Sequence, residues 1–153
     1  MVSVQSFSHS RQPLDYSPCK HYDGNSIDCA DHTAFHVLNA FRRNRDNGDL
    51  EMIYLREIAD MTDDILAEIL DIVSASASHS VREIGLSILP QVAKVPGSLK
   101  NFTNLQTLYL EGMDRFKTLP FASLTLPPSL TEIVCVFNHN LESIESGAFQ
   151  GMN

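Results

Sequence analysis

The chain has 153 residues, 43% of them apolar, which is enough for one domain with a core of ordinary size. Its 11 basic and 19 acidic residues give a net charge of -8, and this acidity argues against a nucleic-acid partner, because phosphate backbones are bound by basic patches. Charged residues or serine interrupt every apolar run before it reaches the roughly 20 residues that span a bilayer, so we expect no membrane span.

Residues 1–16 are expected to form an extended or disordered tail. This segment lacks the basic start and the apolar stretch of a signal peptide. Residues 17–49 are predicted to form an N-terminal cap. In this cap, Cys19 and Cys29 lie on either side of a turn with the sequence Asp-Gly-Asn, and a hairpin of this kind brings two sulfur atoms within bridging range. The third cysteine, Cys135, lies far away in an apolar run, so the spacing indicates one local disulfide and one buried thiol.

A metal site is the alternative interpretation of the cap. Four zinc-competent side chains lie within this short span: Cys19, His21, Cys29 and His32. The Cys-x-His pair does not match the ligand spacing of common zinc fingers, so the disulfide is preferred. His32 and His36 are interpreted as the solvated edge of a helix.

A helix is predicted in the second half of the cap. We expect Asp31 to cap its N-terminus and Asn47-Gly48 to stop it. Its predicted apolar face consists of Ala34, Phe35, Val37, Leu38 and Phe41. The helix should pack as a lid on the first of the strands that follow.

Four segments share one spacing of aliphatic residues, at positions one, four and six. They begin at residues 50, 81, 105 and 130, which are 31, 24 and 25 residues apart. This alternation predicts strands with one buried face. Residues 50–153 are therefore predicted to contain about four repeats, with the bounds 50–80, 81–104, 105–129 and 130–153.

The segments between these strands differ from one another. Residues 62–73 are predicted to form an amphipathic helix, with Thr62 as its N-cap and two carboxylates in its first turn. The acidic residues of this region are interpreted as solvated surface, in preference to an active site or a calcium site. Prolines at 90, 96, 120, 127 and 128 favour short turns in the later segments.

The repeated spacing resembles the leucine-rich-repeat family, whose consensus is L-x-x-L-x-L-x-x-N. The segment from Leu130 to Asn138 follows this pattern throughout, with Cys135 at position six, and that from Leu105 to Leu110 follows its first six positions. The ending Ser-Gly-Ala-Phe-Gln-Gly-Met is similar to repeats of extracellular members. The cysteine-bearing start resembles arthropod proteins akin to the non-catalytic subunit of a shrimp luciferase.

Two features depart from the family pattern. Position nine is Ile58, Leu89 or Met113 in the first three repeats, which should weaken the side-chain ladder between repeats. The cap carries two cysteines where extracellular members usually carry four.

The resemblance implies an α/β solenoid with a parallel sheet on its concave face and an irregular or helical convex side. Asn153 stands where a further strand should begin, so we expect the solenoid to be incomplete at its C-terminus. Its open edge is then expected to favour self-association.

In such a solenoid, positions three, five and seven of each strand face the concave surface, because positions four and six point inward. These positions are Met52, Tyr54, Arg56, Glu83, Gly85, Ser87, Thr107, Tyr109, Glu111, Glu132, Val134 and Val136. Two tyrosines beside a glycine indicate an aromatic contact strip. The alternative is an ordinary mixed surface.

Two further residues carry specific expectations. Asn101 begins the glycosylation sequon Asn-Phe-Thr on a connecting segment, where a glycan would meet solvent. Cys135 occupies an inward position and is expected to be a core residue, not a nucleophile. The sequence contains no nucleophile elbow, phosphate loop or dinucleotide fingerprint, so we expect no catalysis, metal or cofactor.

These features favour a non-enzymatic module that binds a protein or other macromolecule through its concave face. The cysteine pair and the sequon favour a secreted protein or an ectodomain. One alternative is an intracellular leucine-rich-repeat adaptor or immune-receptor fragment, favoured by the missing signal peptide and the free Cys135. The other is a non-catalytic accessory subunit of an oxidase, which only the narrower resemblance implies.

Overall fold

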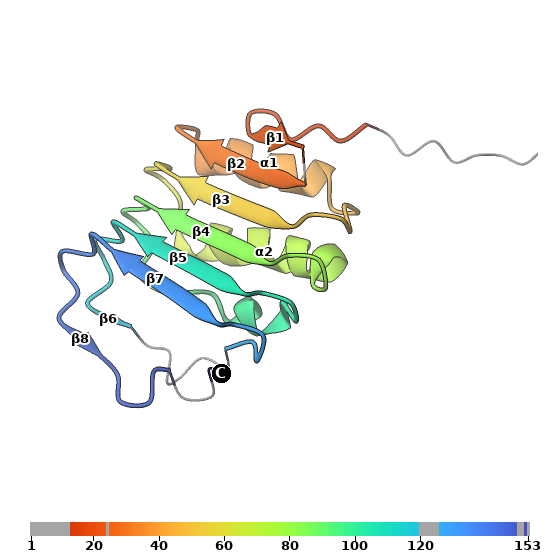
Figure 1. The fold of residues 1–153 in the computed structure, drawn as a ribbon. Helices are drawn as coiled ribbons and strands as arrows, with labels where there is room; N and C mark the ends of the chain where they lie inside the picture. The colour runs from red at the N-terminus through yellow and green to blue at the C-terminus, as the bar shows by residue number, and fades with distance from the viewer. Residues whose placement is uncertain (1–12, 24, 120–125, 150–151, 153) are drawn as a thin grey trace, which may run out of the picture.

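The chain folds as a mixed α/β structure with a mostly parallel sheet and two helices (Figure 1). The computed structural model describes residues 13–23, 25–119, 126–149 and 152. Its elements are β1 (Lys20–Tyr22), β2 (Ser26–Ala30), α1 (Ala34–Arg43), β3 (Met52–Arg56), α2 (Asp63–Ala77), β4 (Glu83–Ser87), the 3₁₀ helix η1 (Gly97–Asn101), β5 (Thr107–Glu111), β6 (Thr118–Leu119), β7 (Glu132–Val136) and β8 (Ser143–Ile144). The helices lie on one face of the sheet. None of those described is long and apolar enough to cross a membrane.

Six strands form the main sheet in the order β1-β2-β3-β4-β5-β7. β1 and β2 form an antiparallel hairpin, and all neighbours from β2 to β7 are parallel. The four strands predicted from the aliphatic spacing are present as β3, β4, β5 and β7. The sequence assigned β2 to the cap alone, but it also extends the parallel sheet, because Ile27 pairs with Ile53 and Cys29 with Leu55.

The core lies between the main sheet and the segments that connect its strands. Ile53 and Leu55 of β3 are fully buried, as are the equivalent aliphatic residues of β5. Phe41, Phe102 and Phe116 fill the core from the connecting side. Burying a large apolar side chain contributes about 1.5–3 kcal/mol, so a shift of register by one residue would expose most of this stabilising surface.

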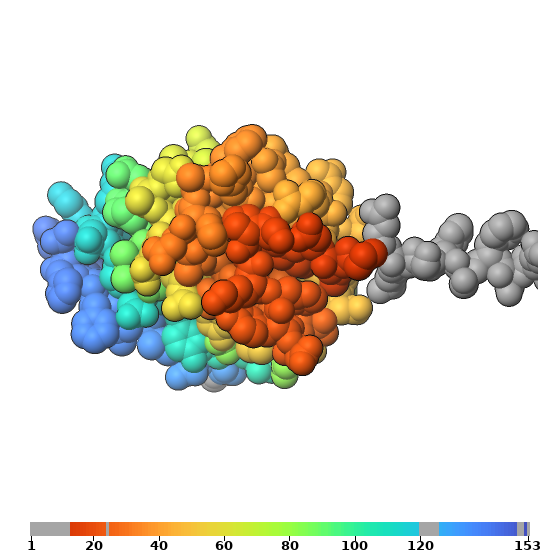
Figure 2. Space-filling model, turned by 90° about the horizontal axis from the view of Figure 1, so that it is seen from above, coloured from red at the N-terminus to blue at the C-terminus, as the bar shows by residue number. Residues whose placement is uncertain are grey.

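The cap begins earlier than predicted. Tyr16 is only 3% exposed, its ring centroid lies 5.5 Å from that of Phe41, and its hydroxyl accepts a hydrogen bond of 3.0 Å from the Asn47 amide. Tyr16 is therefore part of the packed structure and not of the predicted tail, whose residues 1–12 lie outside the described chain. Seen from above, the hairpin and α1 cover one end of the molecule (Figure 2).

Helix α1 starts after the predicted position. Its N-cap is Thr33, whose hydroxyl accepts a hydrogen bond of 3.4 Å from the His36 N–H. Asp31 is not the cap, because it directly follows β2 in a left-handed conformation with φ 57° and lies two residues before the observed cap. His32 therefore precedes the helix and does not share a helix edge with His36.

The buried face of α1 matches the prediction at four of five positions. Ala34, Val37, Leu38 and Phe41 are buried. Phe35 is 60% exposed, because it lies off the stripe that these residues form. The helix ends at Arg43 with Asn44 as its C-cap, before the predicted stop at Asn47-Gly48.

Helix α2 begins at the predicted cap. The Thr62 hydroxyl accepts a hydrogen bond of 3.3 Å from the Ile65 N–H. The first turn of the helix contains the two acidic residues Asp63 and Asp64. Negative charge at this end is favourable for the helix dipole. α2 packs beside α1, where the Arg42 Nε donates to the Glu68 carboxylate at 3.0 Å.

Two acidic residues near α2 fasten one connecting segment to the next. The Asp60 carboxylate accepts a hydrogen bond of 2.8 Å from the Ala34 N–H, 26 residues earlier in the chain. The Asp63 carboxylate accepts bonds of 2.9 and 3.2 Å from the N–H groups of Ala93 and Lys94. Asp60 is exposed and Asp63 is partly exposed, so both residues lie at the surface as predicted, and they also join neighbouring segments.

Asn138, at position nine of the last motif, also joins neighbouring segments. Its carbonyl oxygen accepts a hydrogen bond of 2.8 Å from the Met113 N–H, and its amide donates one of 2.9 Å to the Leu110 carbonyl. At the equivalent positions, Ile58, Leu89 and Met113 are fully buried. Apolar packing thus replaces the asparagine ladder in the earlier segments.

β7 forms one edge of the main sheet, and its inward residues are less buried than predicted. Cys135 is a free, half-buried thiol, and burial raises its pKa. Ile144 and Phe149, which follow β7, are 51% and 46% exposed. No described strand lies beyond β7 to cover them.

Candidate functional site

The face of the main sheet opposite the helices carries the predicted contact residues. The parallel register places these residues in three rows that cross the strands. The rows are Met52, Glu83, Thr107 and Glu132; Tyr54, Gly85, Tyr109 and Val134; and Arg56, Ser87, Glu111 and Val136. The middle row brings the two tyrosines to opposite sides of Gly85.

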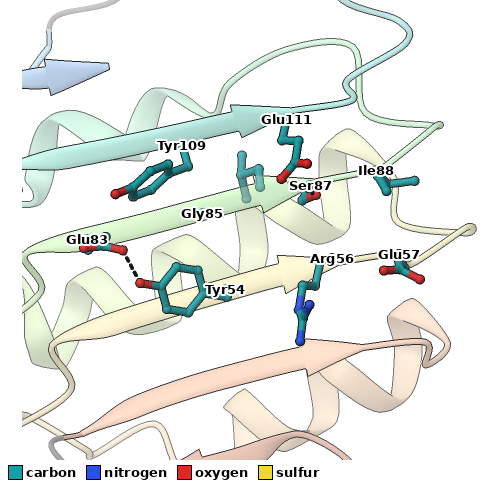
Figure 3. Close-up of a pocket in the computed structure, with 10 residues that line it drawn as sticks. Tyr54, Arg56, Glu57, Glu83, Gly85, Ser87, Ile88, Tyr109 and Glu111 are labelled. Carbon is teal, nitrogen blue, oxygen red and sulfur yellow. Dashed lines mark hydrogen bonds between the residues drawn. The ribbon is translucent and has the colours of Figure 1, made fainter. Parts of the chain in front are cut away.

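An open pocket of about 390 Å³ lies on this face (Figure 3). We call it the Gly85 pocket, and its lining consists of Tyr54, Arg56, Glu57, Glu83, Gly85, Leu86, Ser87, Ile88, Tyr109 and Glu111. Seven of the twelve predicted positions line it. The other five, which are Met52, Thr107, Glu132, Val134 and Val136, lie on the same face outside the lining.

Gly85 leaves room for the ring of Tyr54. A Cβ atom at position 85 would lie 2.6 Å from Cδ1 and 3.2 Å from Cε1 of Tyr54. The first distance is far shorter than the 3.5–4.0 Å at which two carbon atoms pack. In Figure 3, Tyr54 extends from β3 and Tyr109 from β5, with Gly85 between them on β4. The missing side chain therefore allows the Tyr54 ring to lie over β4 in the middle row, where it forms one wall of the pocket.

Carboxylates control the electrostatics around both tyrosines. The Tyr54 hydroxyl donates a hydrogen bond to Glu83 (Figure 3). Burial raises the pKa of Tyr54, and the hydrogen bond to Glu83 raises it further. The negative charge of Glu83 is also the main cause that raises the pKa of Tyr109. Both phenols are thus neutral at pH 7, and the fixed charges near them are negative.

Arg56 is the basic residue of the lining, and its charge is balanced from the adjacent strand. Its Nε and Nη2 donate to the two oxygens of Asp28 at 2.8 and 2.6 Å, and this hydrogen bonding raises the pKa of Arg56. Asp28 was not predicted as a site residue. It is brought to the site because β2 pairs with β3, and the alternation Ile27-Asp28-Cys29 was the signal in the sequence.

A repeated backbone feature positions two residues that the strand pattern missed. The residue after each parallel strand has a positive φ between 51° and 58°, and these residues are Asp31, Glu57, Ile88, Gly112 and Phe137. The N–H groups of Glu57 and Ile88 donate to carbonyls of the next strand at 3.0 and 2.9 Å. A left-handed conformation is rare for a β-branched residue, and here it places Ile88, which is 47% exposed, at the pocket.

Replacing Tyr54 with phenylalanine should remove a tyrosine ionisation that occurs at a higher pH than that of an ordinary tyrosine. In the wild type, Tyr54 stays protonated above the ordinary tyrosine pKa of about 10, because burial and Glu83 oppose the phenolate. The stability that this neutral phenol contributes is fully present below that pH and is lost as the pH rises toward the raised pKa. Phenolate absorbance during a reversible alkaline titration measures the step.

Glu83→Gln provides the matched test, because it keeps the size of the side chain and removes its charge. The late step of Tyr54 should move toward lower pH in this variant. If Tyr54→Phe instead removes a step at the ordinary tyrosine pKa, the described environment of Tyr54 is wrong.

The remaining predicted residues lie outside the lining. The sulfur atoms of Cys19 and Cys29 are 2.02 Å apart, as expected for the local disulfide, so neither is free for the alternative zinc site. Within the described ranges, no group of three or more histidine, cysteine or acidic residues is arranged to hold a metal ion. Asn101 is exposed at the end of η1, on the connecting side.

No protein-family model, curated protein or solved structure matches this chain. No comparison therefore assigns a role to the Gly85 pocket.

Proposed function

We propose that the chain is a leucine-rich-repeat solenoid that acts as a non-enzymatic recognition module and binds a protein through the open face of its main sheet. Support for the solenoid comes from the shared register of β3, β4, β5 and β7, each of which occupies the same positions of the repeated aliphatic motif. The hydrogen bonds of the left-handed residues repeat from strand to strand in the same way.

The observation that carries the binding function is the Gly85 pocket. It lies in the middle of an open sheet face and contains two tyrosines. Tyrosine is enriched among residues that dominate binding energy, because it offers a large rigid ring with a polar end. The lining also combines apolar surface with a few fixed polar groups, as binding sites do.

A secreted or ectodomain location is part of the proposal. The Cys19–Cys29 disulfide favours an oxidising compartment, and Asn101 of the sequon is accessible for glycosylation. The free Cys135 is the observation that favours the intracellular alternative. Reverse-phase mass mapping of the protein from its native source would show whether Cys19 and Cys29 are bridged and whether Asn101 is modified.

Site-specific photo-crosslinking tests the binding face. A crosslinking residue at Thr107 lies on the open face next to the tyrosines, and one at Ala75 lies on the exposed side of α2. In extracts or fluids of the native source, a partner should crosslink to the Thr107 variant and not to the Ala75 variant. The purified partner should then bind Tyr109→Ala at least about tenfold more weakly than the wild type.

Equal crosslinking from both positions, or unchanged affinity for the Tyr109→Ala variant, would contradict binding through the open face. The far-ultraviolet circular dichroism of the variant serves as the control for folding. Tyr109 is partly exposed, so its truncation leaves the buried core unchanged.

A further inference from the structure

The charge of the Gly85 pocket is unbalanced. Three carboxylates line it, those of Glu57, Glu83 and Glu111, and one cation, Arg56, does so. Arg56 directs both donating nitrogens to Asp28, which lies outside the lining, so its charge is already compensated. Among the described residues, none forms a salt bridge with the three lining carboxylates. The pocket therefore favours a cationic group and disfavours phosphates and carboxylates.

The shape of the pocket restricts the kind of cation. Tyr54 and Tyr109 stand on strands separated by β4, which places their backbones roughly 10 Å apart, at about 4.8 Å per strand. The Tyr54 ring lies over Gly85, so the open part of the pocket extends along Tyr109 and Glu111 to the exposed apolar surface of Ile88. This is space for a flat group with an apolar stem. Aromatic faces attract cations through their quadrupole.

Glu111 is oriented for such a group. It accepts a hydrogen bond of 3.2 Å from the Ser87 hydroxyl through Oε2, while Oε1 accepts no hydrogen bond from any described residue. Figure 3 shows Glu111, Ser87 and Tyr109 at neighbouring places along the pocket. A carboxylate held in this way can accept two parallel N–H donors from a planar cation.

We propose that the Gly85 pocket receives an arginine side chain of the protein partner, with its guanidinium on the Glu111 carboxylate and against the ring of Tyr109, and its methylene stem along Ile88. This inference rests on the proposed binding function and specifies the chemistry of the partner. Arginine is favoured over lysine because the guanidinium is planar, less strongly hydrated and able to stack on a ring while it donates a paired hydrogen bond.

Capped tripeptides test the proposal directly on the full chain. Gly-Arg-Gly is compared with Gly-citrulline-Gly, which has the same shape without the charge, and with Gly-Lys-Gly. Backbone amide shifts in the nuclear magnetic resonance spectrum report the site, through Gly85, Ser87 and Ile88. The arginine peptide should shift these amides saturably at millimolar concentration, and both other peptides should bind at least about threefold more weakly.

Charge-removing variants supply the second arm. Glu111→Gln should weaken binding of the arginine peptide by roughly threefold to tenfold. Glu142→Gln makes the same charge change at an exposed position outside the pocket and should leave the affinity unchanged. Equal binding of citrulline, equal binding of lysine, or shifts that map elsewhere would each overturn the arginine assignment. If these tests fail while Tyr109→Ala still weakens the crosslinked partner, the open face remains the binding surface and only the partner chemistry is wrong.

Discussion

Removal of the bridge between Cys19 and Cys29 is expected to lower the free energy of unfolding by about 3 kcal/mol, because the crosslink restricts the unfolded chain across a loop of this length. The two cysteines are separated by 10 positions. Cys19 directly precedes β1, and Cys29 lies in β2, so the disulfide joins the two arms of the hairpin. For a domain of this size, the change corresponds to a fall in the melting temperature of roughly 6–12 °C. The appropriate variant is Cys19→Ala with Cys29→Ala, since a serine at the fully buried Cys29 would place a hydroxyl in the core.

Reductant and the third cysteine provide the controls for this prediction. A reducing agent should lower the melting temperature of the wild type to near that of the double variant and leave the double variant unchanged. Cys135→Ala should retain the sensitivity to reductant, because Cys135 is a free thiol. A double variant that melts with the wild type under oxidising conditions would show that the bridge does not stabilise the cap.

The strands of the main sheet were predictable because their signal is local. Aliphatic residues at positions four and six must face the core, and the residues between them must face outward. Ile53 with Leu55 and Leu108 with Leu110 satisfy this rule and are fully buried. Helix α2 was predictable for a similar reason, since Thr62 caps it within a single turn of the chain.

The errors concern interactions between residues far apart in sequence. Asp31 has the side chain of a good cap, but the end of β2 needs it in a left-handed conformation, and Thr33 caps α1 instead. Asp60 and Asp63 do lie at the surface, but the hydrogen bonds that they accept from backbone N–H groups of other segments cannot be identified from a helix face. A local sequence pattern identifies residues that can donate or accept hydrogen bonds, but it does not identify the distant residues with which they form these bonds.

The candidate site was predictable as a face but not as a pocket. Alternation placed Tyr54, Gly85 and Tyr109 on one surface, and the register of the parallel strands aligns them. Glu57 and Ile88 escaped prediction, because alternation ends with the strand and the left-handed turn after it redirects the chain. The shape of the pocket depends on how the Tyr54 ring packs over Gly85. The alternation of residues along a strand does not determine this packing.

Gly85→Ala is expected to destabilise the protein by about 2 kcal/mol and to disrupt the Gly85 pocket, because a methyl group in this place forces the Tyr54 ring to move. The added Cβ would lie 2.6 Å from Cδ1 of that ring, whose hydroxyl is held by Glu83. Displacement of the ring should also lower the pKa of Tyr54 toward its ordinary value, since both burial and the contact with Glu83 decrease. Gly97→Ala is the matched control, because a Cβ at Gly97 meets no atom within 4 Å.

A double-mutant cycle separates this steric effect from any general intolerance of side chains at position 85. In the Tyr54→Ala background the ring is absent, and alanine is preferred to glycine in a strand, so Gly85→Ala should become neutral or stabilising. The coupling energy between the two positions, measured by denaturant unfolding of the four proteins, should therefore be about 2 kcal/mol. If Gly85→Ala destabilises both backgrounds equally, the glycine serves the strand itself and not the ring of Tyr54. A coupling of the expected size would instead show that Gly85 and Tyr54 form one unit, in which the absence of one side chain allows the other to lie flat across the sheet and shape the pocket.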